Sequence, residues 1–368
     1  MTALPALEKL SAAAYTVPTD GPESDGTIAW DATTVVVVTA SAGGETGLGY
    51  AYGSGAAAAV ADGVLFPAVR GDGHRSAADV PAAYAAMVRE VRNIGRAGVA
   101  STAISATDTA LWDLKARLLG LPLADLLGRV RPAVAAYGSG GFCSYTPEQL
   151  TEQLGGWAAQ GYRMVKMKVG RNPADDIDRV ATARKAIGPD VALFVDANGA
   201  YDRREALAFA EAFSAFDVAW FEEPVSSDDL DGLRLVRDRA PAGMAVAAGE
   251  YGHDPWYFRR MLAAGAVDVL QADATRCGGV SGFLAADALC QAFGVPLSAH
   301  TSPTLHAHLC CAVPTAVHVE AFHDHLRLEA LLFDGALVPE DGMLRPAADR
   351  PGLGLALRAA AAEYAAAV

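Results

Sequence analysis

The sequence is poor in cysteine, and it lacks both long apolar runs and dense clusters of lysine and arginine. Its five cysteines are an odd number at scattered positions, so they do not predict a disulfide framework. No apolar run approaches the length that spans a bilayer, and Glu8 and Lys9 stand where a signal peptide would carry its apolar core. We therefore expect a cytoplasmic protein with no membrane partner.

The charge of the chain is acidic, with a net value of −14 at pH 7. This balance argues against nucleic acid and anionic membrane surfaces as partners, because both require positive patches. A length of 368 residues with 52% hydrophobic and 20% charged residues is typical of a globular protein with a sizeable core. An anionic small substrate would need local positive charge or a metal ion.

The first part of the chain indicates an α+β unit. Residues 33–40 and 46–52 are predicted to be two strands joined by a turn, and helical patterns follow near residues 82–95 and 100–120. Residues 16–30 are rich in glycine, proline, aspartate and threonine, so we expect them to form a loop.

From about residue 133 the pattern changes to short apolar strands that alternate with amphipathic helices. This alternation is typical of βαβ units and a parallel sheet, and eight such strands suggest a barrel. Beyond about residue 326 the rhythm stops, and we expect the tail to pack on the N-terminal part. The predicted strands are residues 133–137, 164–169, 192–196, 218–222, 244–250, 267–273, 296–300 and 317–321.

An ionisable residue lies at the end of each of the last seven predicted strands. A barrel brings strand ends to one mouth, where chemistry is found in this architecture. The alternative for Asp196, a turn that caps the next helix, is less favoured because the pattern recurs in every later strand. The residues are Lys166 and Lys168, Asp196, Glu222 and Glu223, Glu250, Asp273, His300 and Glu320.

Three of these strand ends are acidic and consecutive: Asp196, one of the pair Glu222 and Glu223, and Glu250. Clustered carboxylates repel one another unless a cation joins them, and oxygen ligands with room for water suit Mg²⁺. The alternative is that the acids pair with the neighbouring lysines, but two lysines cannot neutralise three acids and a substrate acid.

The remaining strand ends are suited to proton transfer. Lys166 and Lys168 share one face of a strand, and each ammonium group is expected to depress the pKa of the other, so that one can act as a base. Asp273 beside His300 would fix the tautomer of an acid/base histidine. Glu320 could stay protonated and donate a hydrogen bond to developing negative charge, with an arginine salt bridge as an equal alternative.

These residues resemble the enolase superfamily, and specifically its mandelate racemase subgroup. The segments "KMKVG", "VDANGAY", "WFEEP", "AAGE", "DATRCGG", "LSAH" and "HVEAF" look like the motifs of that family, in the family's order. The resemblance covers nearly the whole chain. It places Asp196, Glu222 and Glu250 on the metal, and it selects the first glutamate of "WFEEP".

The resemblance implies an α/β fold: a modified TIM barrel, (β/α)₇β, with an α+β capping domain. The capping domain would comprise residues 1–128 and be completed by residues 327–368, and the barrel would comprise residues 129–326. The loop at residues 16–30 would close over the site. Its Thr19, Asp20, Glu23, Asp25 and Trp30 are then candidates for binding the distal end of the substrate.

The implied reaction is Mg²⁺-dependent abstraction of the proton next to a carboxylate, with one ion per active site and a metal-stabilised enediolate. Lys168 and His300 would serve opposite faces of the carbon, Lys166 and Glu320 would stabilise the enediolate, and Asn198 would assist. We favour dehydration of a sugar acid, an aldonate or aldarate, to a 2-keto-3-deoxy acid. A racemase or epimerase of 2-hydroxy acids, or a cycloisomerase, is the alternative. Family members are commonly homo-oligomers, which we expect here.

Other interpretations stay open on the residues alone. A Schiff-base aldolase also needs a lysine of low pKa but not three carboxylates. A binding protein that has lost its catalytic activity is disfavoured, because every expected catalytic residue is present. The muconate-lactonising branch of the family is also disfavoured, because this chain has Asp273 where that branch has a lysine. Tyr251 and His325 are further candidates to contact substrate. The run "HAHLCC", with His306 and His308, fits no common zinc spacing, and "GSGG" at residues 138–141 is predicted to be a turn.

Overall fold

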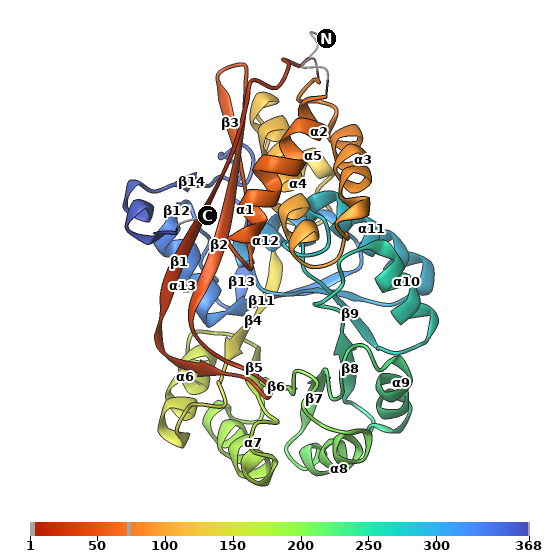
Figure 1. Cartoon of the computed structure of the whole chain (residues 1–368). Helices are drawn as coiled ribbons and strands as arrows, with labels where there is room; N and C mark the ends of the chain where they lie inside the picture. Colours follow the sequence, from red (N-terminus) through yellow and green to blue (C-terminus); the bar gives the residue numbers. More distant parts are fainter. Residues whose placement is uncertain (1–3, 72–74, 367–368) are drawn as a thin grey trace.

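The computed structural model describes residues 4–71 and 75–366 of the chain. Within them, parallel strands form a closed barrel, and an antiparallel sheet with helices lies against one side of it (Figure 1). Strand β11 pairs with strand β4, and this pairing closes the barrel. The barrel strands are β4 (Val134–Gly140), β5 (Met164–Lys168), β6 (Ala192–Asp196), β7 (Val218–Glu222), β8 (Ala245–Ala248), β9 (Val269–Ala272), β10 (Leu297–Ala299) and β11 (Ala316–Phe322).

Each barrel strand up to β10 is followed by a helix on the outside of the barrel, which is the (β/α)₇β arrangement. All eight predicted strands overlap the observed ones, because strands buried on both faces read as continuous apolar runs. The predicted fold class is therefore confirmed. The helices are α6 (Pro147–Ala159), α7 (Pro173–Ile187), α8 (Arg203–Ser214), α9 (Leu230–Arg239), α10 (Pro255–Ala263), α11 (Gly279–Phe293) and α12 (Pro303–Ala312).

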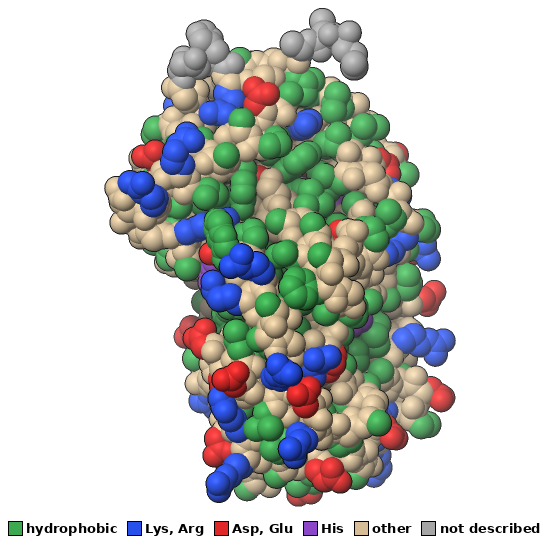
Figure 2. Space-filling model, turned by 90° about the vertical axis from the view of Figure 1, so that its right-hand side faces the viewer, with side chains coloured by type: hydrophobic (Ala, Val, Ile, Leu, Met, Phe, Trp, Pro, Cys, Tyr) green, Lys and Arg blue, Asp and Glu red, His purple; other side chains and the backbone are tan. Residues whose placement is uncertain are grey.

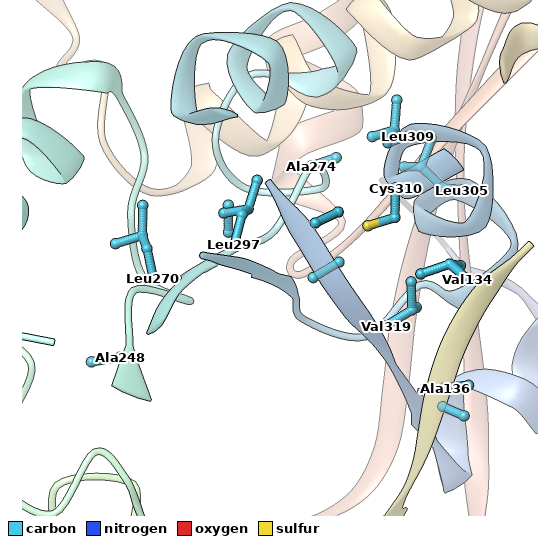
Figure 3. Packing of buried hydrophobic residues seen from close by; sticks show 14 of the residues in the cluster. Val134, Ala136, Ala248, Leu270, Ala274, Leu297, Leu305, Leu309, Cys310 and Val319 are labelled. Atoms are coloured by element: carbon cyan, nitrogen blue, oxygen red, sulfur yellow. The ribbon is translucent and has the colours of Figure 1, made fainter. Parts of the chain in front are cut away.

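The main core lies between the barrel strands and these helices. In Figure 3, Leu305, Leu309 and Cys310 of α12 lie beside Val134 of β4 and Val319 of β11, and all five side chains are buried. Apolar burial of this kind contributes about 25 cal/mol for each Å² removed from water. It fixes the strands, and therefore also the position of the polar residues at their ends.

The capping unit is a four-stranded antiparallel sheet whose order is β15-β1-β2-β3. The helices α1 (Ala56–Val60), α2 (Phe66–Arg70), α3 (Val80–Glu90) and α4 (Val99–Leu118) belong to the same unit, and a π-helical turn (Ala61–Leu65) joins α1 to α2. Its strands are β1 (Lys9–Ser24), β2 (Ala29–Ala42), β3 (Glu45–Tyr52) and β15 (Ala365–Ala366).

Helix α4 packs closely on strand β3 at Gly49. A Cβ atom at this position would lie 2.1 Å from the carbonyl oxygen of Ala106 and 2.4 Å from the amide nitrogen of Ala110. The side chain of glycine is therefore what allows the helix backbone to lie directly on the sheet.

The C-terminal segment returns to both units. After α13 (His323–Leu332), strand β13 (Met343–Leu344) pairs antiparallel with β4 of the barrel, and β12 (Phe333–Asp334) pairs with β14 (Ala356–Leu357). A 3₁₀ helix (Ala359–Tyr364) then leads to β15, which pairs with β1. The tail thus joins the capping sheet as expected, while the boundaries at residues 128 and 326 stay a prediction.

Two sequence-based expectations for local structure were wrong. Residues 16–24 are not a loop but the second half of strand β1, which pairs with β2 across a register shift between Pro18 and Glu23. The ladder with β2 supplies the hydrogen bonds that the proline- and glycine-rich sequence does not predict. Residues 138–140 likewise lie inside strand β4 rather than in a turn.

The hairpin between β1 and β2 reaches down to the barrel in Figure 1. At its tip, a Cβ atom on Gly26 would lie 2.6 Å from the carbonyl oxygen of Ala197 and 2.7 Å from that of Val169. Arg171 also donates a hydrogen bond to the carbonyl oxygen of Ile28 at 3.2 Å. The hairpin tip is therefore packed against the ends of β5 and β6.

The surface shows mixed charge. On the face drawn in Figure 2, positive and negative side chains are interspersed over the lower half, and hydrophobic side chains are more frequent over the upper half. The acidic excess of the chain is therefore not gathered into one region of that face. Among the described residues, no helix has both the length and the apolar character required to cross a membrane.

Candidate active site

Three carboxylates meet at the carboxyl ends of neighbouring barrel strands. Asp196 ends β6, Glu222 ends β7, and Glu250 follows β8, and their exposures are 0%, 0% and 3%. One oxygen atom of each lies within 4.8 Å of the others. Three buried oxygen donors at this separation fit a hard divalent cation such as Mg²⁺.

Asn198, two residues after Asp196, brings a further oxygen to the lining of the cavity at the barrel mouth. Its backbone N–H donates to Oδ1 of Asp196 at 2.9 Å, which holds the residue in the left-handed region with φ of 47°. The side-chain Oδ1 of Asn198 is buried and accepts no hydrogen bond from the described residues. A buried, unpartnered amide oxygen costs stability unless a ligand or water satisfies it, so this atom is suited to contact a bound group.

The two lysines of β5 lie beside the carboxylates. Lys168 Nζ lies 2.5 Å from Oδ2 of Asp196, and Lys166 Nζ lies 2.5 Å from Oε1 of Glu222 and 2.8 Å from Oε1 of Glu320. The alternative noted from the sequence, that acids and lysines pair, is therefore seen in this structure. Both lysines are buried, so these charge-assisted contacts are strong.

The expected depression of the lysine pKa values by each other is wrong for this structure. Burial lowers the pKa of Lys166, but the charges of Glu222 and Glu320 outweigh it and leave the pKa well above its usual range. For Lys168, burial again lowers the pKa, but the charges of Asp196, Glu222 and Glu250 together outweigh it, and the net shift is upward. Mutual repulsion is the smaller effect because each ammonium group is closer to a carboxylate.

His300 and Asp273 form a buried pair at the ends of β10 and β9. Nδ1 of His300 lies 2.8 Å from Oδ2 of Asp273, and the N–H of Thr275 donates to the other oxygen of Asp273 at 2.7 Å. The second ring nitrogen, Nε2, lies 3.2 Å from Oε2 of Glu250. Burial lowers the pKa of His300, but Glu250, Glu320 and the Asp273 hydrogen bond raise it more, so the net shift is upward.

The contacts of Glu320 on β11 favour its ionised form, which goes against the expectation that it could stay protonated. Its Oε1 accepts from the hydroxyl of Ser139 at 2.6 Å, and its Oε2 accepts from the N–H of Thr301 at 3.1 Å. Burial raises the pKa of Glu320, but Lys166 and His300 outweigh burial and lower the pKa to about 2. The residue therefore accepts hydrogen bonds and holds Lys166 in place.

Two residues that the sequence reasoning did not assign support the site. Nη1 of Arg276 donates to Oε1 of Glu250 at 3.2 Å, and its guanidinium lies over the ring of Tyr251 at 5.0 Å. His306 is fully buried on α12 and bonds to the backbone just after Asp273 and just after His300. Arg276 lies three residues after Asp273, a spacing that could have indicated it.

A cavity of about 290 Å³ opens at the barrel mouth between the strand ends and the β1–β2 hairpin. Of the predicted site residues, it brings together Lys168, Glu250, His300, Glu320, Asn198, Asp25, Trp30, Tyr251 and His325.

Thr19 and Asp20 do not line this cavity. They line a neighbouring hollow, which shares Trp30 with it. There Nε2 of His323 lies 3.0 Å from Oδ2 of Asp20. The two histidines of the run "HAHLCC", His306 and His308, do not face this hollow. Each accepts a hydrogen bond from a backbone N–H, that of Ala274 for His306 and that of Ala124 for His308.

Two family models match the chain. Residues 18–128 match the mandelate racemase / muconate lactonizing enzyme N-terminal domain, and residues 149–361 match the enolase C-terminal domain-like family. The first match includes β2 and β3 of the capping sheet, and the second includes barrel strands β5 to β11.

Characterised relatives cover most of the chain. A 3,6-anhydro-alpha-L-galactonate cycloisomerase of Streptomyces coelicolor is 34% identical over 85% of this chain and 86% of its own. An L-talarate/galactarate dehydratase of Salmonella typhimurium is 34% identical over 76% of this chain and 69% of its own. Both relatives are enzymes that act on acids derived from sugars.

Solved structures agree with the same assignment. A mandelate racemase/muconate lactonizing enzyme-like protein of Rubrobacter xylanophilus is 54% identical, with a TM-score of 0.96 over 98% of this chain and 100% of its own. A racemase of Streptomyces coelicolor with bound magnesium is 31% identical, with a TM-score of 0.91 over 98% of this chain and 100% of its own. The chain therefore belongs to the mandelate racemase/muconate lactonizing enzyme family of the enolase superfamily.

Proposed function

We propose that the protein is a Mg²⁺-dependent acid-sugar dehydratase, which removes the proton next to the substrate carboxylate and then expels the hydroxyl group from the neighbouring carbon. The observation that carries this proposal is the cavity at the barrel mouth. It is lined by both Lys168 and His300, two proton-handling groups from strands β5 and β10, and by the carboxylate of Glu250.

Asp196, Glu222 and Glu250 are the residues that would hold the cation, since they supply three buried oxygen donors within 4.8 Å. A bound Mg²⁺ would supply positive charge beside the substrate carboxylate and would share the charge of the three acids with the neighbouring lysines. The chain's own groups perform the remaining chemistry.

Lys168 is the base in this proposal. Lys168 lines the cavity, and it pairs with Asp196, which is one of the three carboxylates that would hold the cation. As the attraction of Asp196 weakens, the pKa of Lys168 falls, and its amine can take the proton from C2. Lys166, held by Glu222 and Glu320, donates to the negative charge that develops on the carboxylate oxygens.

His300 is the acid. Asp273 orients the ring through Nδ1 and supports the charged form, so Nε2 can carry a proton into the cavity. Given to the hydroxyl group on C3, this proton lets the hydroxyl leave as water. Tautomerisation of the resulting enol then yields the 2-keto-3-deoxy acid. The C2 proton is then on Lys168, and the C3 hydroxyl has left as water with the proton from His300.

A second candidate is an isomerase, either a racemase or epimerase, in line with the 31% identity to a racemase, or a cycloisomerase, in line with the 34% identity to a cycloisomerase. It shares the first proton transfer and differs only in the fate of the enediolate. His300 would return a proton to C2 for racemisation or epimerisation instead of protonating a leaving group.

The test is proton NMR in D₂O with Mg²⁺ and a panel of aldonic and aldaric acids. Growth of a 3-deoxy methylene signal would support dehydration, whereas deuterium at C2 with both epimers present would support the isomerase. Lys168→Ala should abolish exchange at C2 for substrates of one configuration. His300→Asn should retain that exchange and lose the methylene. No exchange with any acid in the Mg²⁺-bound protein would contradict both candidates.

A further inference from the structure

We propose that the substrate is a monocarboxylate whose far end is uncharged, an aldonate-type acid rather than an aldarate with a second carboxylate. This inference rests on the proposed function, which places the reacting carboxylate beside Asp196, Glu222 and Glu250. It concerns the opposite end of the cavity, and it distinguishes between the substrate types named for the two relatives described above.

The positive charges of the cavity all belong to its reactive end. Among the residues that the structure describes, the cationic side chains that line the cavity are Lys168, Arg276 and His300. Each is already paired with an acid: Lys168 with Asp196 at 2.5 Å, Arg276 with Glu250 at 3.2 Å, and His300 with Asp273 at 2.8 Å. These contacts hold the cations at the strand ends.

The far end of the cavity is aromatic and hydroxylic. Trp30 forms part of its wall, and Thr33 and Thr34 add hydroxyl groups from β2, while the ring of Phe322 lies toward the reactive end, with its centroid 6.0 Å from Nζ of Lys168. These groups can pack on a carbon chain and exchange hydrogen bonds with alcohols. None of them carries a charge that would compensate a carboxylate.

His325, which also lines this end, does not supply the missing charge. Its ring stacks on that of Tyr52, with the centroids 3.5 Å apart. Burial is the main cause that lowers the pKa of His325 to about 3, so the imidazole is neutral at physiological pH. A neutral imidazole both donates and accepts, which suits a hydroxyl group.

Acids surround the far end. Oδ2 of Asp324 accepts a hydrogen bond from the hydroxyl of Thr33 at 2.6 Å, and Asp324 is fully buried. Glu23, 1% exposed, accepts from the indole N–H of Trp30 at 2.6 Å. Arg327 lies nearby, and its Nη2 donates to Asp324 at 2.8 Å and to the carbonyl oxygen of Pro18 at 2.6 Å. Its Nε is buried without a hydrogen-bond partner among the described residues, and Arg327 does not line the cavity.

The electrostatic field at this end follows from these contacts. Burial raises the pKa of Glu23 to about 8, and the charges of Asp324 and Asp20 contribute to the rise. At physiological pH Glu23 is therefore mainly protonated, and the charge of Asp324 is paired with that of Arg327. A second substrate carboxylate would lose part of its hydration without gaining an unpaired cation among the described residues that line the cavity. Burial of an uncompensated charge disfavours binding, so we expect aldonates to be preferred at least about tenfold.

The experiment compares acids of the same configuration that differ only at C6, such as D-gluconate with D-glucarate and D-galactonate with galactarate. Two quantities are measured for each: turnover, from the methylene signal, and affinity, from calorimetry with Mg²⁺ and a slow variant, Lys168→Ala. Turnover tests the proposed function, and the affinity ratio tests the charge preference.

The outcomes separate the two proposals. Tighter binding of the aldonates supports the inference, and it does so even if no acid is dehydrated, in which case the proposed function alone fails. Equal or tighter binding of the aldarates overturns the inference while dehydration can still stand. If neither class binds the Mg²⁺-loaded protein, both proposals are overturned.

A pair of variants at Ala32 tests the cause. Ala32 lines the cavity next to Trp30 and Thr34 on β2 and makes no side-chain hydrogen bond that would be lost. Ala32→Lys places a cation at the far end, and Ala32→Met is the uncharged control of similar size. The lysine variant should move the aldarate-to-aldonate affinity ratio toward aldarates by about tenfold relative to the methionine variant. An unchanged ratio would contradict the electrostatic origin of the preference.

Discussion

The Nε2 atom of His306 accepts a hydrogen bond from the amide of Ala274 at 2.9 Å. Its Nδ1 lies 2.7 Å from the carbonyl oxygen of Thr301, so the ring proton resides on Nδ1 and the imidazole is neutral. Ala274 directly follows Asp273, and Thr301 directly follows His300. One buried ring thus fixes the two loops that carry the acid–histidine pair.

His306→Leu should therefore impair catalysis through position. The loss of both hydrogen bonds should cost about 1–3 kcal/mol of unfolding free energy for each unpartnered group. Misplacement of His300 should lower kcat on the order of tenfold and change KM little. His308→Leu is the matched control, since His308 also accepts a buried amide, that of Ala124 at 3.3 Å, away from the pair. Equal kcat values for the two variants in steady-state assays would contradict the positioning role.

Asp273→Asn tests the pair itself. The amide cannot stabilise a charged His300 as the carboxylate does, so kcat for formation of the keto acid should fall by about 10²–10⁴-fold. Exchange of the C2 proton through Lys168 should persist, because Lys168 pairs with Asp196 instead. Loss of both activities in equal measure, recorded by NMR in D₂O, would show that the variant damages more than the acid.

Metal binding should stabilise the fold through the three carboxylates. Titration with Mg²⁺ should raise Tm, and at a concentration of about 100 times Kd the gain is about 2.7 kcal/mol. Glu250→Gln removes one of the three charges and should abolish most of this shift, and a chelator should reverse it in the unaltered protein. Glu152→Gln, at an exposed position of α6, should leave the shift intact. Tm is measured by differential scanning calorimetry. If Glu250→Gln keeps the rise in Tm on addition of Mg²⁺, the three carboxylates are not the main Mg²⁺ site.

Gly49→Ala should destabilise the capping unit, because its Cβ would meet the backbone of α4 at 2.1 Å and 2.4 Å. Forced separation of the helix and the strand should cost about 1–3 kcal/mol. Gly63→Ala provides the comparison, since no atom lies within 4 Å of its Cβ and alanine favours a helical segment. In urea unfolding, the midpoint of Gly49→Ala should lie well below the midpoint of Gly63→Ala. Equal midpoints would contradict the close contact between α4 and β3.

Glu329 should make stability depend on pH. The side chain is buried and accepts from the hydroxyls of Tyr50 at 2.6 Å and Thr304 at 2.5 Å. Burial raises its pKa to about 7 from an ordinary value of 4.5. Its protonated form therefore contributes stability that is complete below about pH 4.5 and is lost as the pH rises through about 7. The slope from this group is at most about 1.4 kcal/mol per pH unit.

Glu329→Gln isolates that contribution. The unfolding free energy of the unaltered protein minus that of the variant should fall between pH 5 and pH 7.5 in urea titrations. A difference that stays constant over this range would show that Glu329 keeps an ordinary pKa in the folded state.

The barrel could be predicted because its strands are buried on both faces and end in ionisable residues. Val165 and Phe194, for instance, lie in apolar runs that stop at Lys168 and Asp196. The strand β1 could not, since its second half contains Pro18 and Gly21, and only its pairing with β2 makes it a strand. Local composition describes a segment alone, while a ladder depends on its partner.

The protonation states within the site could not be predicted from the sequence, for a similar reason. Strand order places Glu320 near other acids, which suggests a raised pKa. Lys166, however, lies only 2.8 Å away, and its charge helps to lower the pKa of Glu320 below the ordinary value. Such a balance depends on distances of a few ångströms. The location of Thr19 and Asp20 in the neighbouring hollow likewise depends on how the hairpin bends, which residue spacing does not encode.

The pairing of β15 with β1 has a consequence for the order in which the enzyme is assembled during translation. The barrel is continuous in the chain from β4 to β11, whereas the sheet that carries the hairpin over the cavity receives its edge strand from residues 365 and 366. Contacts between such distant segments form slowly, and domains fold as the chain emerges from the ribosome. The first three strands of the capping sheet thus leave the ribosome before the barrel, and the sheet gains its last strand only after every barrel strand has been synthesised.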